Sequence, residues 1–335
     1  MRKGIAVNNT PVGPDHDQIQ AIPEIAGWSE NLVAQVHDPT AAASVWAHWS
    51  RIPEVPHVWE GVIAVYLPYG ELLVSRSFGP SPTKQVASSG PLSFACEEPG
   101  GRWRVRFDGM ARRTTSDELA AGSLTDGEVE RVEVELELTG LHPLWSAHGN
   151  MTGQVWASAH LEQACRIVGE VVTTDGATPI AGVGFRDHSY GPRDYSGMSG
   201  DTWCSAVLPS GHVLLALNVW QEAGPTLAVG YVWDGTALHD ATALELPRMA
   251  DGSGEPRRFT GSITTALGTD RFECVSERGM TWTMDHPVGM TAGARAAPDR
   301  MRCVESPARI SFRGETAAGW IERSMRPRHF RTPKR

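Results

Sequence analysis

Apolar and polar residues alternate with a period of two along much of this chain. In Arg131 to Leu138, four apolar side chains share one side of the segment and three glutamates share the other, as in a strand with one solvent-facing surface. Similar short segments recur, separated by turns rich in Gly, Pro and Asp. The other predicted strands are Trp59 to Leu67, Leu72 to Phe78, Trp103 to Phe107, Ile167 to Thr173, Trp203 to Leu208, His212 to Trp220, Leu227 to Trp233, Arg271 to Val275, Met280 to Met284 and Arg309 to Phe312.

Helical patterns are few and short. Asn31 to Val36 is one candidate, and Thr40 to Trp49 is a second that follows the start signal Asp38-Pro39. Many short strands with turn signals between them are typical of sandwiches and barrels. The sequence therefore predicts an all-β protein built of antiparallel barrel or sandwich domains with few short helices.

The length of the chain favours more than one domain. Its 335 residues, at roughly 150 residues per domain, suggest about two. The turn after the glutamate-rich strand places the domain boundary near residues 140 to 155. We expect an unstructured segment over residues 1–20, β-domains over 21–150 and 151–325, and a basic tail over 326–335.

Charge and hydropathy exclude two classes of partner. The 30 basic and 39 acidic side chains give a net charge of −9, so the chain has no overall basic field to attract nucleic acid. The longest uninterrupted apolar run, Val213 to Leu217, is far shorter than the roughly 20 residues that a membrane helix needs. We therefore expect neither a nucleic-acid partner nor an integral membrane segment.

The N-terminal residues and the cysteines favour a cytoplasmic protein. The first residues lack the apolar core and cleavage site of a secretory signal. The five cysteines are scattered, odd in number and never spaced as CxxC, which disfavours both a disulfide framework and a thiolate zinc site.

The densest group of polar residues lies in Gly182 to Tyr195, which contains two Arg, two Asp, one His and two Tyr. Asp187 and His188 could be a proton donor and acceptor pair held by Arg186 and Arg193. The alternative is a structural Arg/Asp network at a strand crossing. In a regular strand Asp187 would face away from Arg186 and His188, so a shared cavity would need a bulge.

A second group lies in Trp156 to Gln163, where strand periodicity puts Trp156, His160 and Glu162 on one face. A carboxyl beside an imidazole and an indole can be either a tuned acid or a surface pair. Both interpretations stay open at this point.

Cofactor motifs are absent from the sequence. It has no P-loop, no GxSxG elbow, and no GxGxxG that follows a strand and opens a helix. His37, His48 and His57 lack a compact metal-binding spacing. We expect neither a metal nor a nucleotide cofactor.

Four segments together resemble AttH-like proteins related to carotenoid 1,2-hydratase. They are HDPT (His37 to Thr40), WEGVIAVYLP (Trp59 to Pro68), HLEQ (His160 to Gln163) and GVGFRDHSYGPRD (Gly182 to Asp194). The similarity spans about residues 36 to 325, and RDHSYGPRD is its most specific part. Tyr190 stands where the family has Trp as often.

This resemblance implies two lipocalin-like β-domains and a lipophilic ligand held in a barrel or between the domains. It implies a cofactor-independent hydratase, dehydratase or cyclase that protonates an isoprenoid-like substrate, with the indoles of the 12 tryptophans lining the pocket or stabilising a carbocation. The alternatives are a non-catalytic carrier of a lipophilic ligand and a polyketide or pericyclic cyclase that uses no acid.

The candidate site follows from these segments. The candidate catalytic residues are Asp187, His188, Glu162 and His160, and the candidate substrate-binding residues are Arg186, Tyr190, Arg193, Asp194, Trp156, Trp203 and Trp220. We rank Asp187 narrowly ahead of Glu162 as the acid, because Arg186 and Arg193 could fix its orientation. The same arginines would lower the pKa of Asp187, which would make Glu162 the better acid.

Overall fold

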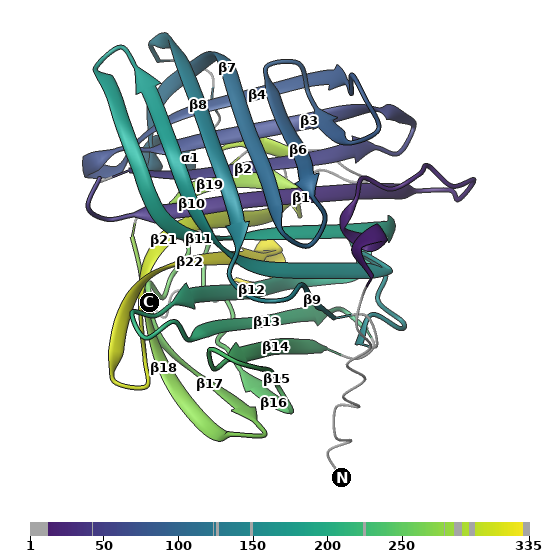
Figure 1. Ribbon diagram of the computed structural model, residues 1–335, viewed down its shortest axis with the longest axis vertical. Coiled ribbons are helices and arrows are strands. Elements are labelled where there is room, and N and C mark those ends of the chain that lie inside the picture. The colour runs from purple at the N-terminus through teal and green to yellow at the C-terminus, as the bar shows by residue number, and fades with distance from the viewer. Residues whose placement is uncertain are drawn as a thin grey trace.

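Strands form nearly all of the regular structure. The computed structural model describes residues 13–41, 43–122, 124, 127–147, 150–223, 226–277, 279–284, 290–294 and 299–330. Within these ranges the chain forms two antiparallel sheets and one short α-helix, α1 (Ser116–Ala121), as Figure 1 shows. The all-β prediction is therefore confirmed. No helix among these residues is long and apolar enough to cross a membrane.

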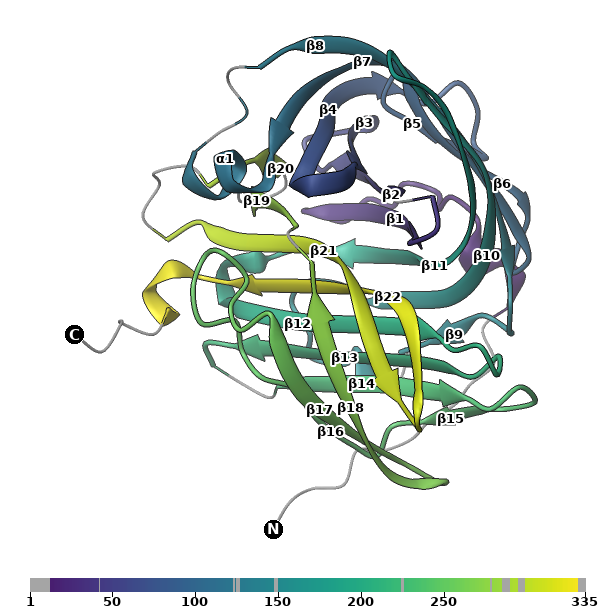
Figure 2. The ribbon, with the colours of Figure 1, turned by 90° about the vertical axis from the view of Figure 1, so that its left-hand side faces the viewer.

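The first sheet closes into a barrel of eight strands, because its end strands β4 and β7 also pair with each other. Figure 2 looks into this ring. Around the barrel the order is β4 (Glu71–Pro80), β3 (Val55–Tyr66), β2 (Ala43–Ile52), β1 (Trp28–Asp38), β11 (Gly176–Pro192), β10 (Ala159–Thr173), β8 (Val129–Gly140) and β7 (Arg102–Thr115). The short strands β6 (Leu92–Glu98) and β5 (Val86–Ser88) extend from β7, and β9 (Trp145–Ser146) pairs with β10.

The second sheet curls into a half-barrel of nine strands. Their order is β15 (Leu238–Asp240), β14 (Leu227–Trp233), β13 (Val213–Gln221), β12 (Met198–Val207), β22 (Glu315–Met325), β21 (Met301–Phe312), β18 (Gly268–Ser276), β17 (Arg258–Thr265) and β16 (Ala243–Glu245). A hairpin of β19 (Met280–Met284) and β20 (Met290–Ala292) joins β21. Short 3₁₀ turns lie at η1 (Pro14–Asp17), η2 (Pro68–Gly70), η4 (Tyr195–Gly197) and η5 (Pro327–His329).

The chain passes from one sheet to the other between Pro192 and Met198. This position is later than the boundary predicted at 140 to 155, because the loop after β8 leads back into the barrel. Its next long strands, β10 and β11, pair with β8 and β1. The segments HLEQ and RDHS thus lie on the barrel side of the change of sheet.

The two predicted helices are strands, and both predictions are wrong. Asn31 to Val36 lies in β1, and Thr40 to Trp49 falls mostly in β2. Nearly every residue of these strands is buried on both faces, so the alternation that marks a half-exposed strand is missing. The apparent start signal is a turn, in which the Asp38 carboxylate accepts hydrogen bonds from the backbone N–H groups of Thr40 and Ala41.

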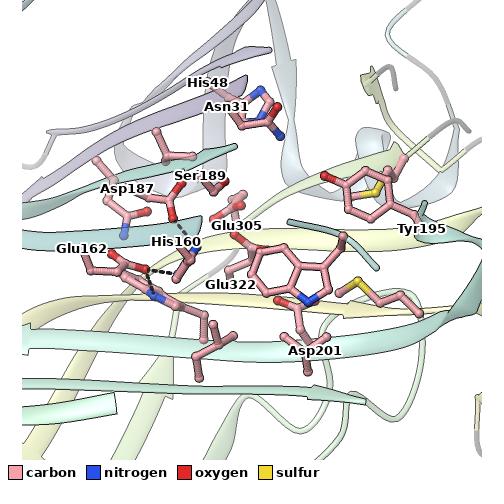
Figure 3. A pocket seen from close by; sticks show the side chains of 18 of the residues that line it. Asn31, His48, His160, Glu162, Asp187, Ser189, Tyr195, Asp201, Glu305 and Glu322 are labelled. Atoms are coloured by element: carbon pink, nitrogen blue, oxygen red, sulfur yellow. Dashed lines mark hydrogen bonds and ion pairs between the residues drawn. The ribbon is translucent and has the colours of Figure 1, made fainter. Parts of the chain in front are cut away.

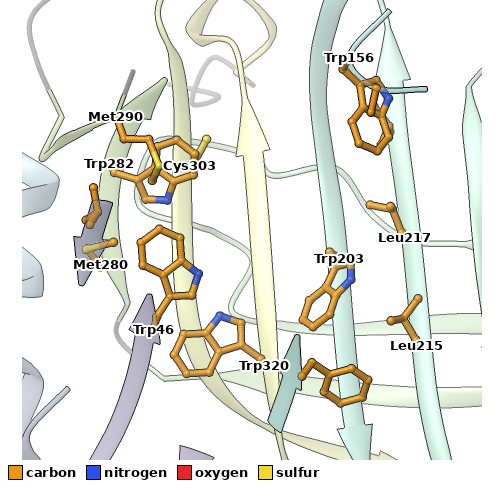
Figure 4. Close-up of a cluster of buried hydrophobic side chains, with 14 of the residues drawn as sticks. Trp46, Trp156, Trp203, Leu215, Leu217, Met280, Trp282, Met290, Cys303 and Trp320 are labelled. Carbon is orange, nitrogen blue, oxygen red and sulfur yellow. The ribbon is translucent and has the colours of Figure 1, made fainter. Parts of the chain in front are cut away.

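Every strand predicted from alternation coincides with an observed strand, although Leu67, Leu208 and His212 fall one residue outside. Three apolar cores account for the double burial of β1 and β2. One core fills the barrel and a second fills the concave side of the half-barrel. A third core lies between the sheets and is rich in tryptophan (Figure 4). Strands at the junction therefore bury one face in their own sheet and the other against the neighbouring sheet.

Both ends of the described chain are tied to the sheets. Residues 1–12 and 331–335, expected to be unstructured and a basic tail, lie outside the described residues. Asp17 in η1, expected to be unstructured, is fully buried and pairs with the Arg186 guanidinium at 2.5 and 2.8 Å. The expected tail begins with Arg326 and Arg328, which bond to neighbouring carbonyl and carboxylate groups.

The pair formed by Asp17 and Arg186 should contribute strongly to stability. In Asp17→Asn the buried guanidinium loses its charged partner, and we expect the free energy of unfolding to fall by about 3–5 kcal/mol. Asp15→Asn changes an exposed carboxylate in the same turn and should cost less than about 0.5 kcal/mol. Urea unfolding of both variants measures the difference. Equal stability of the two variants would show that η1 is not anchored through this pair.

Candidate functional site

A pocket lies between the outer face of the barrel and the face of the second sheet that packs against it. Strands β1, β2, β10 and β11 form one wall, and β12, β13, β19, β21 and β22 form the other. Its empty volume, including the part open to solvent, is about 790 Å³. Its lining combines apolar side chains with a few convergent polar ones, as small-molecule sites do, and Figure 3 shows the polar side chains in it.

On the barrel wall, His160 lies between two carboxylates. Its Nε2 atom is 3.0 Å from Glu162 Oε1, and its Nδ1 atom is 3.0 Å from Asp187 Oδ2. Glu162 and Asp187 are register partners on β10 and β11, which places both side chains on the same face. Trp203, on the opposite wall, donates its indole N–H to Glu162 Oε1 at 2.8 Å. We call His160, Glu162 and Asp187 the His160 cluster.

Burial and charge shift the pKa values of His160 and Glu162 within the His160 cluster. Burial alone would lower the pKa of His160, but the charges and hydrogen bonds of Asp187 and Glu162 raise it to about 10. Burial raises the pKa of Glu162 to about 7, although His160 and Trp203 oppose this shift. His160 is therefore a cation at neutral pH, and Glu162 can gain or lose a proton there.

On the opposite wall, three carboxyl groups lie together without a basic partner among them. Asp201 lies on β12, Glu305 on β21 and Glu322 on β22, and both Asp201 and Glu305 are in hydrogen-bond contact with Glu322. Glu305 also accepts the indole N–H of Trp320 at 2.8 Å. We call Asp201, Glu305 and Glu322 the carboxyl cluster. Burial and the neighbouring carboxylate of Glu322 hold the pKa values of Asp201 and Glu305 well above their usual range.

Apolar and aromatic side chains make up much of the rest of the pocket lining. Trp46, Trp282 and Trp156 contribute indole rings, and the rings of Trp46 and Trp282 lie 6.2 Å apart. The indole N–H groups of Trp46 and Trp282 are buried and have no hydrogen-bond partner among the described residues. His48 also lines the pocket, and burial lowers its pKa to about 3. The pocket is thus apolar overall and carries two separate acidic groups.

Six of the residues predicted from the sequence do line this pocket: His160, Glu162, Asp187, Trp156, Trp203 and Arg193. Asp187 is held by His160 rather than by either arginine. Arg193 donates to the backbone carbonyls of Trp156 and Ser189 and to the Tyr195 hydroxyl. The reason for ranking Asp187 first, orientation by Arg186 and Arg193, is therefore not supported by these contacts.

His188 and Arg186 point to the opposite face of β11, into the barrel. His188 is fully buried and lies 2.9 Å from Glu30, while Arg186 bonds to Asp17 and Gln163. β11 runs without the bulge that would bring His188 beside Asp187. The predicted pair of Asp187 and His188 is thus divided between the pocket and a structural network.

Tyr190, Asp194 and Trp220 also lie away from the pocket lining. The Tyr190 hydroxyl bonds to His16 at 2.6 Å. The Asp194 carboxylate caps η4 by accepting the Ser196 N–H. Trp220 packs in a small core with Met249, Val304 and Met325. Each of these side chains has a structural partner where we had expected contact with substrate.

The sequence pattern did not reveal the carboxyl cluster. Glu305 follows Val304 in the mostly buried strand β21, Glu322 follows Ile321 in the buried half of β22, and Asp201 is two residues before Trp203. An acidic residue in the middle of a buried strand was the available signal, because such a position needs a partner. The three residues are far apart in sequence, and only the pairing of β12, β22 and β21 brings them together.

Among the described residues, His160, Glu162 and Asp187 form the one group of three whose ligand atoms all lie within 4.8 Å of one another, as a metal site requires. Both imidazole nitrogens already contact a carboxylate. Binding an ion through His160 would break one of these contacts, so the arrangement fits a charge-paired group better than a metal centre.

Solved structures with the same fold cover nearly the whole chain. A protein of Nitrosomonas europaea described as an AttH matches with a TM-score of 0.57 and 14% identity, over 94% of this chain and 98% of its own. Kievitone hydratase from Nectria haematococca matches with a TM-score of 0.57 and 10% identity, over 96% and 94%. CghA matches with a TM-score of 0.57 and 9% identity, over 96% of each chain.

These matches define the class of protein: an AttH-like fold of tandem β-domains, as the sequence resemblance indicated. The chain belongs to the family described as a domain of unknown function, DUF7064, whose model matches residues 13–327. A search of curated protein sequences finds no significant match.

The ionisation of Glu162 should be visible at Trp203. Above pH 7 the carboxylate of Glu162 is charged and accepts a stronger hydrogen bond from the indole N–H. We expect the Trp203 indole signal in ¹H–¹⁵N NMR, assigned with Trp203→Phe, to titrate with a midpoint of about 7. Glu162→Gln should abolish this step. A Trp203 signal that stays constant near neutral pH would show that Glu162 does not titrate there.

Proposed function

We propose that this protein is a cofactor-independent lyase or isomerase of the hydratase or cyclase type. It acts by acid–base chemistry on a hydrophobic, isoprenoid-like substrate in the pocket between the sheets. The observation that carries the proposal is Glu162, a buried carboxyl that can exchange a proton at neutral pH in an apolar, tryptophan-lined cavity. The fold shared with kievitone hydratase supports the same class of reaction.

The geometry gives Glu162, His160 and Trp203 distinct tasks. Glu162 exchanges the proton, because its pKa of about 7 allows both states. His160 stays charged and holds Glu162 and Asp187 in place through its two nitrogens. Trp203 fixes Glu162 Oε1 from the other wall, while Oε2 has no hydrogen-bond partner in the part of the chain that the structure describes. Oε2 is therefore the oxygen that is free to meet a substrate C–H or a water molecule.

Addition of water or closure of a ring requires a cationic intermediate when it starts from an alkene and a proton. The indole faces of Trp46, Trp282 and Trp203 can stabilise such a cation. Ionised Glu162 then removes a proton, either from the carbon next to the cation or from the water molecule that attacks it. The first route gives an isomer or a cyclised product, and the second gives a hydrated one.

Solvent deuterium provides a direct test of this function. Acyclic isoprenoid alkenes, incubated with the protein in D₂O, should gain deuterium at carbon or be converted to alcohols or rings, detected by mass spectrometry. Glu162→Gln should lower this rate by at least about 10², while the matched variant Glu170→Gln, at an exposed position on the same strand, should keep it. Tight binding by the wild-type protein without any exchange would instead identify a carrier.

A further inference from the structure

The carboxyl cluster of Asp201, Glu305 and Glu322 has no part in the proton exchange at Glu162, yet it faces the same pocket. Asp201 and Glu305 are 4% and 0% exposed, and all three carboxyl side chains line the cavity. Two carboxyl groups in contact cannot both ionise cheaply at such a site, because like charges without water repel strongly. A carboxyl–carboxyl hydrogen bond also needs a proton, since two carboxylates are both acceptors only.

The contacts define how many protons this group holds. Glu322 is the central member, a register partner of Glu305, and it contacts both Glu305 and Asp201. Each of the two contacts needs a proton, because carboxylate oxygens only accept hydrogen bonds. Three carboxyls with two protons carry one negative charge in total.

Charged neighbours do not replace this arrangement. Arg323 lies near Asp201 but donates to the backbone carbonyls of Gly254, Pro256 and Pro247. Tyr66 donates its hydroxyl to the backbone carbonyl of Glu305. Across the pocket, the cation His160 and the carboxylate Asp187 act on Glu322 with opposite signs. Ser324 is an uncharged neighbour whose hydroxyl donates to Asp201 Oδ1. The two protons are therefore held by the three carboxyls, with this hydroxyl as a further partner of Asp201.

One oxygen of this group is available to a ligand. Glu305 Oε2 accepts the Trp320 indole, whereas Oε1 is buried and receives no hydrogen bond from an N–H group. The unpartnered indole N–H groups of Trp46 and Trp282 line the same cavity. A buried polar atom that lines a pocket without such a donor marks a position where substrate or water completes the contact.

We infer that Asp201, Glu305 and Glu322 together are the proton source of the pocket, with Glu305 as the carboxyl that meets the substrate. This inference rests on the proposed function and assigns its acid to the wall opposite Glu162. The substrate class stays that of the proposed function, an apolar molecule with a carbon–carbon double bond.

The proton transfer balances as follows. The O–H bond of Glu305 breaks and its electron pair stays on the oxygen, while the π-electron pair of the alkene forms the new C–H bond. The positive charge appears on the neighbouring carbon and faces the carboxyl cluster, which has lost one proton and gained one negative charge. Glu162 takes up a proton at the end of the sequence, and water that enters as product leaves restores both groups.

A stable organic cation can stand in for the charged intermediate. Geranyldimethylamine is protonated at neutral pH, and geraniol has a similar apolar chain without the charge. We expect the wild-type protein to bind the amine about tenfold more tightly than the alcohol. Amine binding should release protons from the carboxyl cluster. Calorimetry at about pH 7 in buffers of different ionisation enthalpy measures this release. Binding of the alcohol should release none.

Variants assign the released protons to their source. Glu305→Gln and Asp201→Asn should each reduce the release and the preference for the amine, while Glu245→Gln, at an exposed position of the same sheet, should change neither. Amine binding without proton release, or release unaffected by both variants, would overturn the inference. If the alcohol still binds in that case, the pocket and the proposed function stand without this acid.

Stability against pH tests the stored protons without any ligand. In the folded protein the carboxyl cluster keeps protons that the unfolded chain loses above the ordinary pKa values of 3.8 for Asp201 and 4.5 for Glu305. The wild-type protein should therefore lose stability as pH rises from about 5 to about 9. Urea unfolding should show a smaller loss in Glu305→Gln and Asp201→Asn than in Glu245→Gln. An equal loss in all three would show that the group is ionised in the folded protein, which contradicts the inference even if neither probe binds.

Discussion

Burial of both faces of the strands at the junction is the constraint on which the rest of the structure depends. β1, β2, β10 and β11 pack one face into the barrel, and their other face meets β12, β13, β21 and β22 across the pocket. Polar side chains on the inner surfaces have little access to water, and each one needs a partner within the protein. The two acidic groups are therefore neutralised by their immediate neighbours rather than by solvent.

The two walls of the pocket meet this requirement in different ways. On the barrel wall His160 supplies a positive charge beside the carboxyls of Asp187 and Glu162, and the pKa of Glu162 is about 7. On the other wall no cation of the described residues contacts Asp201, Glu305 and Glu322 directly, so protons provide the balance. One wall is thus suited to accept a proton and the other to supply one. A substrate held between them would meet an acid and a base on opposite sides.

The sequence predicted those features that depend on local alternation, and it failed where both faces of a strand are buried. Arg131 to Leu138 was identifiable because one side of β8 is wet, whereas β1 and β2 looked helical because neither side is. The motifs at His160 and Asp187 were found from their composition. Glu305 and Glu322 were missed, because their function depends on strand pairs that join distant segments, and no single segment carries that information.

The RDHS segment shows why structural and chemical roles cannot be separated in this fold. Arg186 and His188 point into the barrel and bind Asp17 and Glu30, while Asp187 points into the pocket. A shift of β11 by one residue would exchange these faces, placing a guanidinium in the pocket and a carboxylate in the barrel. The buried pairs in the barrel therefore fix the register that brings Asp187 to His160. For this reason a substitution at Arg186, which does not line the pocket, should still disturb the chemistry through the position of Asp187.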